Sequence, residues 1–362
     1  MPFGLYLHIP YCEGKCRYCD FYSKGGSRSV PDEYVDALMR EMRRYCNCDC
    51  TSLRPDTLYF GGGTPSLLTP SQVARLIDAA APAPKAEITL EANPDTVTAE
   101  SLSGYRRAGV NRLSIGVQSA NDTQLRRLGR PHDAAAARRA LKLARQAGFE
   151  NLSGDLMLAL PEYSYEELDQ TLALLIDGGV THISSYLLKI EPKTPFGLHP
   201  PTGLPDEDTA ADFYLYAVDR MRAAGFTQYE ISNFARPGYE SRHNLIYWNC
   251  EDYLGLGPVA YSCMGGVRFH YPPDLRGFLA GSAETLQDGR LDAAEYIMLQ
   301  TRLAAGLDLD RLAARWKVLL NERQLRLLQA CETAGLCHLS SNRLTLTPKG
   351  MLVQNSILTE VF

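Results

Sequence analysis

The sequence predicts an α/β protein: a partial (β/α)6 TIM-like barrel, open on one side, with a small C-terminal mostly helical (winged-helix-like) domain. Three observations lead to this prediction. Short apolar or β-branched runs alternate six times with segments whose apolar residues recur every three or four positions. The runs are apolar throughout, as in strands that are covered on both faces. In the last part of the 362-residue chain, helical patterns replace this alternation.

The predicted barrel strands are short, apolar runs; they span residues 3–9, 57–60, 87–92, 112–116, 151–158 and 182–188. The helical segments between them include residues 34–45, 71–81, 134–147 and 166–176. After a Pro- and Gly-rich connection we expect a helix at 209–224, a short strand at 229–231 and a loop from 232 to about 266. We therefore expect a barrel over residues 1–205, an extension over 206–289 and a C-terminal domain over 290–362, which ends in a strand (343–347) and a helix (348–358).

The charge balance argues against a nucleic-acid partner, because the formal net charge is −5 and no basic surplus is present to neutralise phosphates. No apolar stretch approaches the roughly 18–20 residues that span a bilayer, and the N-terminus lacks the segments of a secretory signal. We expect a cytoplasmic protein without a membrane span, for which peripheral membrane association stays open. Its 10 cysteines are then reduced thiols or metal ligands.

Three cysteines, Cys12, Cys16 and Cys19, follow the first predicted strand with the spacing CxxxCxxC. Three thiolates are one short of the four that usually close an iron–sulfur cube, so one iron of a [4Fe–4S] cluster would keep an open position. Two alternatives are a zinc site, with His8 or Asp20 as the fourth ligand, and three unrelated buried thiols. The every-other-residue spacing of a second triplet suits one metal poorly, and we interpret it as unligated thiols: Cys46, Cys48 and Cys50.

The cysteine motif, with the aromatic Tyr18 before its last cysteine and a strand before its first, resembles that of the radical-SAM superfamily. In that family the open iron binds the amino and carboxylate groups of S-adenosylmethionine (SAM). An electron that enters through the cluster then cleaves SAM to a 5′-deoxyadenosyl radical. The resemblance therefore implies a [4Fe–4S] cluster, SAM and an electron donor for the cluster.

Further segments fit a SAM pocket. A Gly-Gly-Gly-Thr-Pro run at 61–65 follows the second strand, where glycines let the backbone approach a ligand closely. Polar residues recur at the carboxyl ends of later strands, where catalytic groups of α/β barrels gather, and Arg130 could pair with the SAM carboxylate. The resemblance implies SAM contacts at nine positions: Tyr6, Phe21, Gly62, Gly63, Thr64, Glu91, Gln118, Arg130 and Asp155.

Within the superfamily, the segments YLHIPYC, YFGGGTPSLL, LEANPDT, RLSIGVQS and LGRPH resemble the oxygen-independent coproporphyrinogen III oxidase group. The true oxidase has a further cysteine where this chain has Phe21. It also has an N-terminal extension before the first strand, which begins here at Phe3. Both departures favour the other branch of the group, the HemW-type haem chaperones.

That branch also has the motif HNxxYW, present here from His243 to Trp248. A neutral imidazole is a common axial ligand of haem iron, and Tyr247 and Trp248 could cover a flat macrocycle. From the residues alone, a surface loop tied down by these side chains fits slightly better. The resemblance turns the prediction to haem binding by His243, Tyr247 and Trp248.

The resemblance implies a haem chaperone that passes haem to acceptor proteins, such as respiratory haem enzymes. The alternative is an oxygen-independent coproporphyrinogen III oxidase of porphyrin biosynthesis. A third reading, a radical-SAM enzyme that modifies RNA through a winged-helix domain, is disfavoured by the acidic charge balance.

Overall fold

The computed structural model describes residues 2–46 and 54–362. Two members of the second cysteine triplet, Cys48 and Cys50, lie outside the described residues, as does the side chain of Cys46. Their interpretation as unligated thiols therefore stays a prediction.

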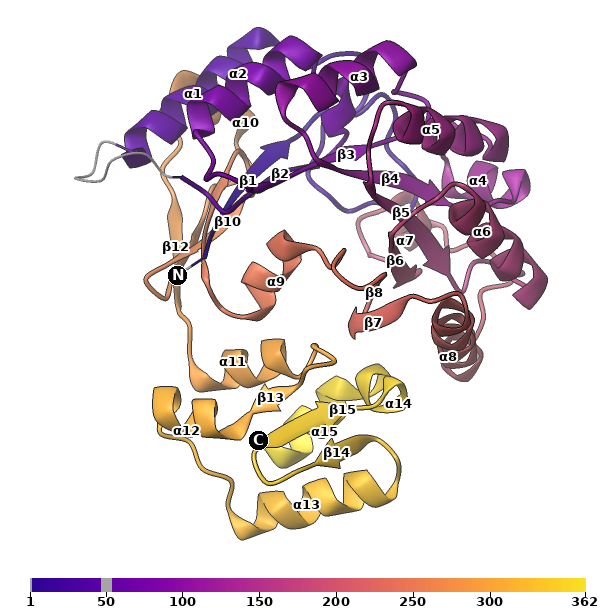
Figure 1. The fold of residues 1–362 in the computed structure, drawn as a ribbon, viewed down its shortest axis with the longest axis vertical. Coiled ribbons are helices and arrows are strands. Elements are labelled where there is room, and N and C mark those ends of the chain that lie inside the picture. The colour runs from indigo at the N-terminus through magenta and orange to yellow at the C-terminus, as the bar shows by residue number, and fades with distance from the viewer. Residues whose placement is uncertain (1, 47–53) are drawn as a thin grey trace.

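One large sheet forms the barrel, with the strand order β12-β11-β10-β9-β1-β2-β3-β4-β5-β6-β8-β7 (Figure 1). Its six consecutive parallel strands are β1 (Phe3–Ile9), β2 (Thr57–Gly62), β3 (Glu87–Ala92), β4 (Arg112–Gln118), β5 (Asn151–Leu158) and β6 (His182–Leu187). The helices after these strands are α1 (Asp32–Cys46), η1 (Pro65–Leu67), α2 (Pro70–Ala80), α3 (Ala99–Ala108), α4 (Asp122–Leu128), α5 (Ala134–Gln146), α6 (Tyr165–Asp177), α7 (Pro195–Leu198) and α8 (Glu207–Ala223). The predicted partial barrel is confirmed, and its predicted strands are correct to within two residues.

Local sequence explains where several barrel helices begin and end. Thr69 and Gln72 form a capping box at the start of α2, and each side chain accepts a hydrogen bond from the backbone N–H of the other. Asp133 caps α5 by accepting from Ala136 N at 2.7 Å. At the end of α3, Gly109 adopts φ 113°, a left-handed conformation that ends helices cheaply only at glycine.

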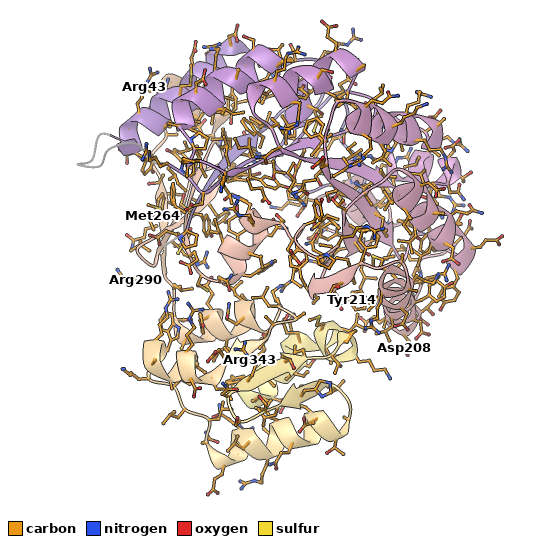
Figure 2. The ribbon with its side chains drawn as sticks, in the orientation of Figure 1. Arg43, Asp208, Tyr214, Met264, Arg290 and Arg343 are labelled. Carbon is orange, nitrogen blue, oxygen red and sulfur yellow. The ribbon has the colours of Figure 1, made fainter. Side chains whose placement is uncertain are left out.

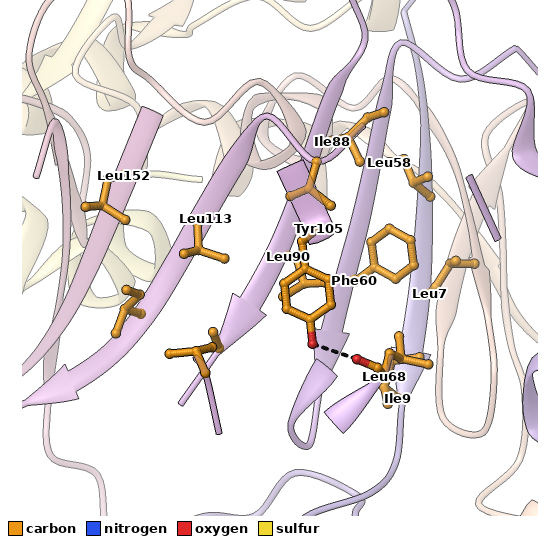
Figure 3. Close-up of a cluster of buried hydrophobic side chains, with 14 of the residues drawn as sticks. Leu7, Ile9, Leu58, Phe60, Leu68, Ile88, Leu90, Tyr105, Leu113 and Leu152 are labelled. Carbon is orange, nitrogen blue, oxygen red and sulfur yellow. Dashed lines mark hydrogen bonds between the residues drawn. The ribbon is translucent and has the colours of Figure 1, made fainter. Parts of the chain in front are cut away.

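The main hydrophobic core lies between the outer face of the sheet and these helices (Figure 3). Apolar strand residues alternate with inward-pointing polar ones, so Leu58, Phe60 and Leu90 are fully buried under the helices. Tyr105 of α3 is 1% exposed within this core. Its hydroxyl donates to the carbonyl of Leu68 at 2.6 Å, as Figure 3 shows, and to that of Ser66 at 2.9 Å.

The expected loop at residues 232–266 is wrong. Within this range the structure has the strand β8 (Asn233–Ala235), the helix α9 (Arg242–Trp248) and the strands β9 (Asp252–Leu256) and β10 (Tyr261–Met264). The strand β7 (Thr227–Glu230) precedes the range, and β11 (Val267–His270), α10 (Leu275–Ala280) and β12 (Leu286–Arg290) follow it. Met264 of β10 and Arg290 of β12 lie on the same side of the molecule (Figure 2). β9 pairs in parallel with β1, more than two hundred residues away. Such distant pairing stabilises short strands whose own sequence is weakly patterned.

The remaining residues form a smaller unit around a second hydrophobic core, with Leu307, Leu328 and Leu344 fully buried (Figure 1). Its three-stranded sheet has the order β13-β15-β14. Its elements are α11 (Ala293–Gln300), β13 (Leu307–Asp308), α12 (Leu309–Trp316), α13 (Glu322–Thr333), β14 (Cys337–Leu339), β15 (Arg343–Leu346), α14 (Pro348–Leu352) and α15 (Gln354–Val361). The helices outweigh the short strands, which confirms the predicted mostly helical C-terminal domain. No helix among residues 2–46 and 54–362 is long and apolar enough to cross a membrane.

Removing the Tyr105 hydroxyl should measure how firmly this core is fixed. Because two buried carbonyls lose their donor, we expect Tyr105→Phe to lower the free energy of unfolding by about 1–3 kcal/mol in urea denaturation. Tyr165→Phe is the matched control: Tyr165 is 43% exposed, so its loss should be near zero. Equal effects of the two substitutions would contradict the assignment.

Candidate cofactor site

The cysteine loop leaves the carboxyl end of β1 and is anchored by backbone hydrogen bonds. Lys24 N donates to Pro10 O at 2.8 Å, and Cys12 N donates to Lys24 O at 3.0 Å. Farther along, Arg17 N donates to Leu128 O at the end of α4 at 3.0 Å. These bonds bury Cys12 and Cys16, whereas Cys19 is half-buried.

The loop and the carboxyl ends of β2 to β6 enclose a cavity of about 310 Å³. Predicted residues that line it are Cys12, Cys16, Cys19, Phe21, Gly62, Gly63, Thr64, Glu91, Gln118, Arg130 and Asp155. The structure thus brings together all three cysteines and eight of the nine SAM positions. Tyr6 does not line the cavity; its hydroxyl lies 3.1 Å from Nδ1 of the buried His8.

The glycine turn after β2 touches the cysteine loop directly. Gly63 N donates to Ile9 O at 2.8 Å, and a Cβ on Gly63 would lie 2.6 Å from Tyr11 O and 3.0 Å from Cys12 Sγ. Gly62 adopts φ 112°, and a Cβ there would lie 2.7 Å from the His8 ring. Only glycine fits these two positions, because any side chain would displace the backbone of the loop.

A chain of hydrogen bonds connects two of the cysteine sulfurs. The Thr64 hydroxyl donates to Cys12 Sγ at 3.3 Å and accepts from Asn93 Nδ2 at 3.2 Å. Arg130 Nη2 donates to Asn93 Oδ1 at 2.8 Å, and Arg130 Nη1 donates to Cys16 Sγ at 3.5 Å. Hydrogen-bond donors aimed at sulfur stabilise the thiolate form that ligates metal.

Two carboxyl groups form the floor of the cavity. Glu91 accepts a hydrogen bond from the Tyr59 hydroxyl at 2.7 Å and a longer one from Gly62 N at 3.3 Å. Burial raises the pKa of Glu91 to about 7, against the opposing effect of these two donors. Asp155 accepts from the Ser114 hydroxyl at 3.1 Å, and burial raises its pKa as well. Glu91 can therefore gain or lose a proton near neutral pH.

The remaining wall shows local strain and crowding of thiols. Gln118 has φ 66° at the end of β4, where the pairing with β5 shifts register; a left-handed non-glycine residue at a cavity is typical of functional sites. At Cys19, burial first and the nearby Cys16 and Cys12 next raise the pKa of the thiol to about 11.

The zinc alternative finds no fourth ligand. His8 has Nδ1 beside the Tyr6 hydroxyl and Nε2 2.9 Å from Tyr22 O, and Asp20 is exposed and does not line the cavity. Within the described ranges, no three His, Cys, Asp or Glu side chains converge as a ready site for one metal ion. Three soft sulfurs around one cavity, two of them with donors, suit a cluster larger than a single ion.

The predicted haem residues do not form an accessible face. The His243 side chain lies inside the barrel, 1% exposed, with Nδ1 2.7 Å from Thr57 Oγ1 and Nε2 2.7 Å from the Tyr247 hydroxyl. Trp248 packs against the second core, with the Arg302 guanidinium 5.1 Å from its ring. Both imidazole nitrogens are engaged, so His243 cannot ligate haem iron in this arrangement.

Sequence reasoning missed three residues at the site: Tyr59, Asn93 and Ser114. Asn93 had a detectable signal, because it follows β3 directly and lies two positions after Glu91. Tyr59 and Ser114 lie within strands, where side chains point alternately into the barrel and toward the helices. The sequence does not show which of the two directions each side chain takes.

Comparisons with known proteins agree with this fold and site. Residues 6–175 match the Radical SAM superfamily, and residues 290–353 match the HemN C-terminal domain. The chain is 45% identical to the heme chaperone HemW of Escherichia coli over 280 residues, which cover 76% of this chain and 72% of that protein. It is 36% identical to the heme chaperone HemW of Bacillus subtilis, with 97% of both chains covered.

Among solved structures, coproporphyrinogen III oxidase (HemN) from Escherichia coli has the same fold, with a TM-score of 0.83 at 23% identity and coverage of 99% of this chain and 89% of that chain. The barrel and its cysteine-lined cavity are those of the radical SAM superfamily. Within that superfamily, the chain belongs to the family of heme chaperone HemW proteins.

The raised pKa of Glu91 predicts a pH-dependent stability. A carboxyl group whose pKa is higher in the folded than in the unfolded state stabilises the fold below pH 4.5, and this contribution is lost as pH rises through about 7. As pH rises from 5 to 8, the unsubstituted chain should lose this contribution, whereas Glu91→Gln has no carboxyl group to ionise. We therefore expect the free energy of unfolding of Glu91→Gln, relative to that of the unsubstituted chain, to increase over this range by up to about 3 kcal/mol. Urea denaturation across that range measures the difference; a difference independent of pH would contradict the shift.

Proposed function

We propose that this chain is a haem chaperone that retains a [4Fe–4S] cluster and SAM in the cysteine cavity and delivers haem to acceptor proteins, including respiratory haem enzymes. The observation that carries the proposal is similarity to HemW proteins over nearly the whole chain together with a cavity that gathers three cysteines. The site is at the carboxyl ends of the strands, where α/β barrels bind their ligands.

In this proposal Cys12, Cys16 and Cys19 hold the cluster. A cluster with three cysteine ligands would keep one iron open to bind SAM. The Thr64 hydroxyl and the Arg130 guanidinium donate to two of the sulfurs and so lower the charge carried by the thiolates.

The cavity wall supports the proposed SAM contacts. Backbone at Gly62 and Gly63 can approach the ligand closely, since neither has a side chain, and the Glu91 carboxylate can accept from the SAM amino group. The Arg130 guanidinium already binds Asn93, the Gly116 carbonyl and Cys16, so we assign it to the cluster side of the cavity rather than to the SAM carboxylate.

Loss of one cluster ligand tests the first half of the proposal. After anaerobic reconstitution we expect about four irons and four sulfides per chain, and a large loss of both in Cys16→Ser. Cys331→Ser is the matched control, because Cys331 lies in α13, away from the cavity. Equal iron content in both variants would contradict the assignment of the cluster ligands.

Haemin titration tests the second half. We expect saturable binding at one haem per chain, followed by the Soret band, and transfer of that haem to an apo acceptor protein. Absence of specific haem binding by the reconstituted chain would contradict the chaperone proposal. Conversion of coproporphyrinogen III to vinyl products during anaerobic turnover with SAM would instead support the oxidase, for which the solved relative provides the fold alone.

A further inference from the structure

We propose that the hairpin strands β10 to β12 carry an iron-porphyrin site in which His270 is the axial ligand, flanked by Tyr261 and Leu286. This inference rests on the proposed haem function and names the residues that would hold the haem. It follows from which histidines are accessible, and from what surrounds the one with the geometry of a metal ligand.

The chain has seven histidines, and four of them are buried: His8, His132, His182 and His243. Three of these four have both ring nitrogens engaged; those of His182, for example, lie 2.8 Å from the Ser153 and Tyr229 hydroxyls. His132 is enclosed, and its Nε2 lies 3.1 Å from the Val117 carbonyl. None of the four can reach a macrocycle as large as haem without unpacking the barrel.

The accessible histidines are His199, His270 and His338. His270 alone among them has an oriented ring: its Nδ1 lies 2.8 Å from Asp288 Oδ2. The carboxylate fixes the proton on Nδ1 and leaves the lone pair of Nε2 free, which is the arrangement of ligating histidines. In the described part of the chain, neither Nε2 of His270 nor the ring of His199 or His338 has a hydrogen-bond partner.

Exposed apolar side chains flank His270 on both neighbouring strands. Tyr261 pairs with it from β10, with ring centroids 4.7 Å apart at 23°, and Leu286 pairs with it from β12. Tyr261 is 55% exposed and Leu286 is 51% exposed. Because an axial imidazole stands upright beneath the porphyrin, side chains on its two sides lie under the macrocycle and can cover its apolar face.

The position of His270 also suits the proposed function. β9 runs parallel to β1 and β10 antiparallel to β9, so Tyr261 and His270 lie at the same end of the sheet as the cysteine loop. Tyr261 and Cys263 lie two residues apart on β10 and therefore share a face of the sheet with Tyr253, the β9 residue opposite Cys263. Three strand spacings separate β11 from β1, or about 14 Å.

The experiment is a haemin titration of the full, reconstituted chain beside four single variants: His270→Ala, Asp288→Asn, His338→Ala and His243→Ala. We expect His270→Ala to weaken binding and shift the Soret band, with free imidazole restoring the band. Asp288→Asn should weaken binding by about tenfold, because the carboxylate orients the ligand. His338→Ala, at an exposed site with no ring contact, should bind as the unsubstituted chain does.

The outcomes separate the two proposals. If the unsubstituted chain binds one haem and His270→Ala binds it with the same affinity and spectrum, the His270 site is wrong while the chaperone proposal stands. If the unsubstituted chain binds no haem, the chaperone proposal fails first. Circular dichroism and the unfolding midpoint of His270→Ala should match those of the unsubstituted chain, since the side chain is partly exposed. A folded His243→Ala variant that alone loses haem would overturn the His270 site.

Discussion

The close contact between the glycine turn of β2 and the cysteine loop of β1 is the constraint on which the rest of the site depends. Parallel pairing sets the carboxyl ends of the two strands side by side, and Gly63 N donates to Ile9 O at 2.8 Å. A side chain at Gly63 would strike both Tyr11 O and Cys12 Sγ. This contact brings the Thr64 hydroxyl within hydrogen-bonding distance of Cys12 Sγ and so helps to position the cysteine loop at the carboxyl end of the barrel.

From that contact a polar network extends into the barrel. TIM-type barrels are usually filled with bulky branched side chains, but the inward positions here are polar. Tyr59 donates to Glu91, and its ring stacks on that of His243 with centroids 4.9 Å apart. The guanidinium of Arg112, 2% exposed, makes no hydrogen bond or ion pair with the residues described. Such an interior is costly for stability, so its persistence indicates that the barrel centre serves the ligand site rather than the fold.

Sequence patterns were sufficient for the barrel but not for the extension. The six parallel strands are short runs separated by amphipathic helices, so their spacing and length identify them. The expectation that these runs are apolar throughout was wrong, because their inward positions are polar. The strands β9 to β12 are short and mix Gly, Tyr and polar residues. Of these, only β9 pairs with β1, and β10, β11 and β12 add to β9 in series. The sequence predicted cavity-lining residues such as Gly63 and Thr64 because they directly follow a strand. The haem site at His243 stays a prediction, because a histidine with aromatic neighbours fits a buried packing role, as the contacts of His243 with Thr57 and Tyr247 show, as well as a ligand role.

The burial of the His243 side chain by α9 has an energetic consequence. The Glu87 carboxylate accepts from the backbone N–H groups of Arg242 and His243, and the His243 ring bonds Thr57 and Tyr247. Withdrawing α9 to expose His243 breaks three of these interactions, because Tyr247 lies on the same helix and moves with His243; each is worth about 1 kcal/mol or more. A cost of about 3 kcal/mol lowers an apparent haem affinity roughly a hundredfold, because only the open fraction can bind. α9 is also tied to the C-terminal domain, since Gln300 Nε2 donates to Trp248 O at 2.8 Å. His243, Tyr247 and Trp248 therefore hold α9 in place between the amino end of the barrel and that domain.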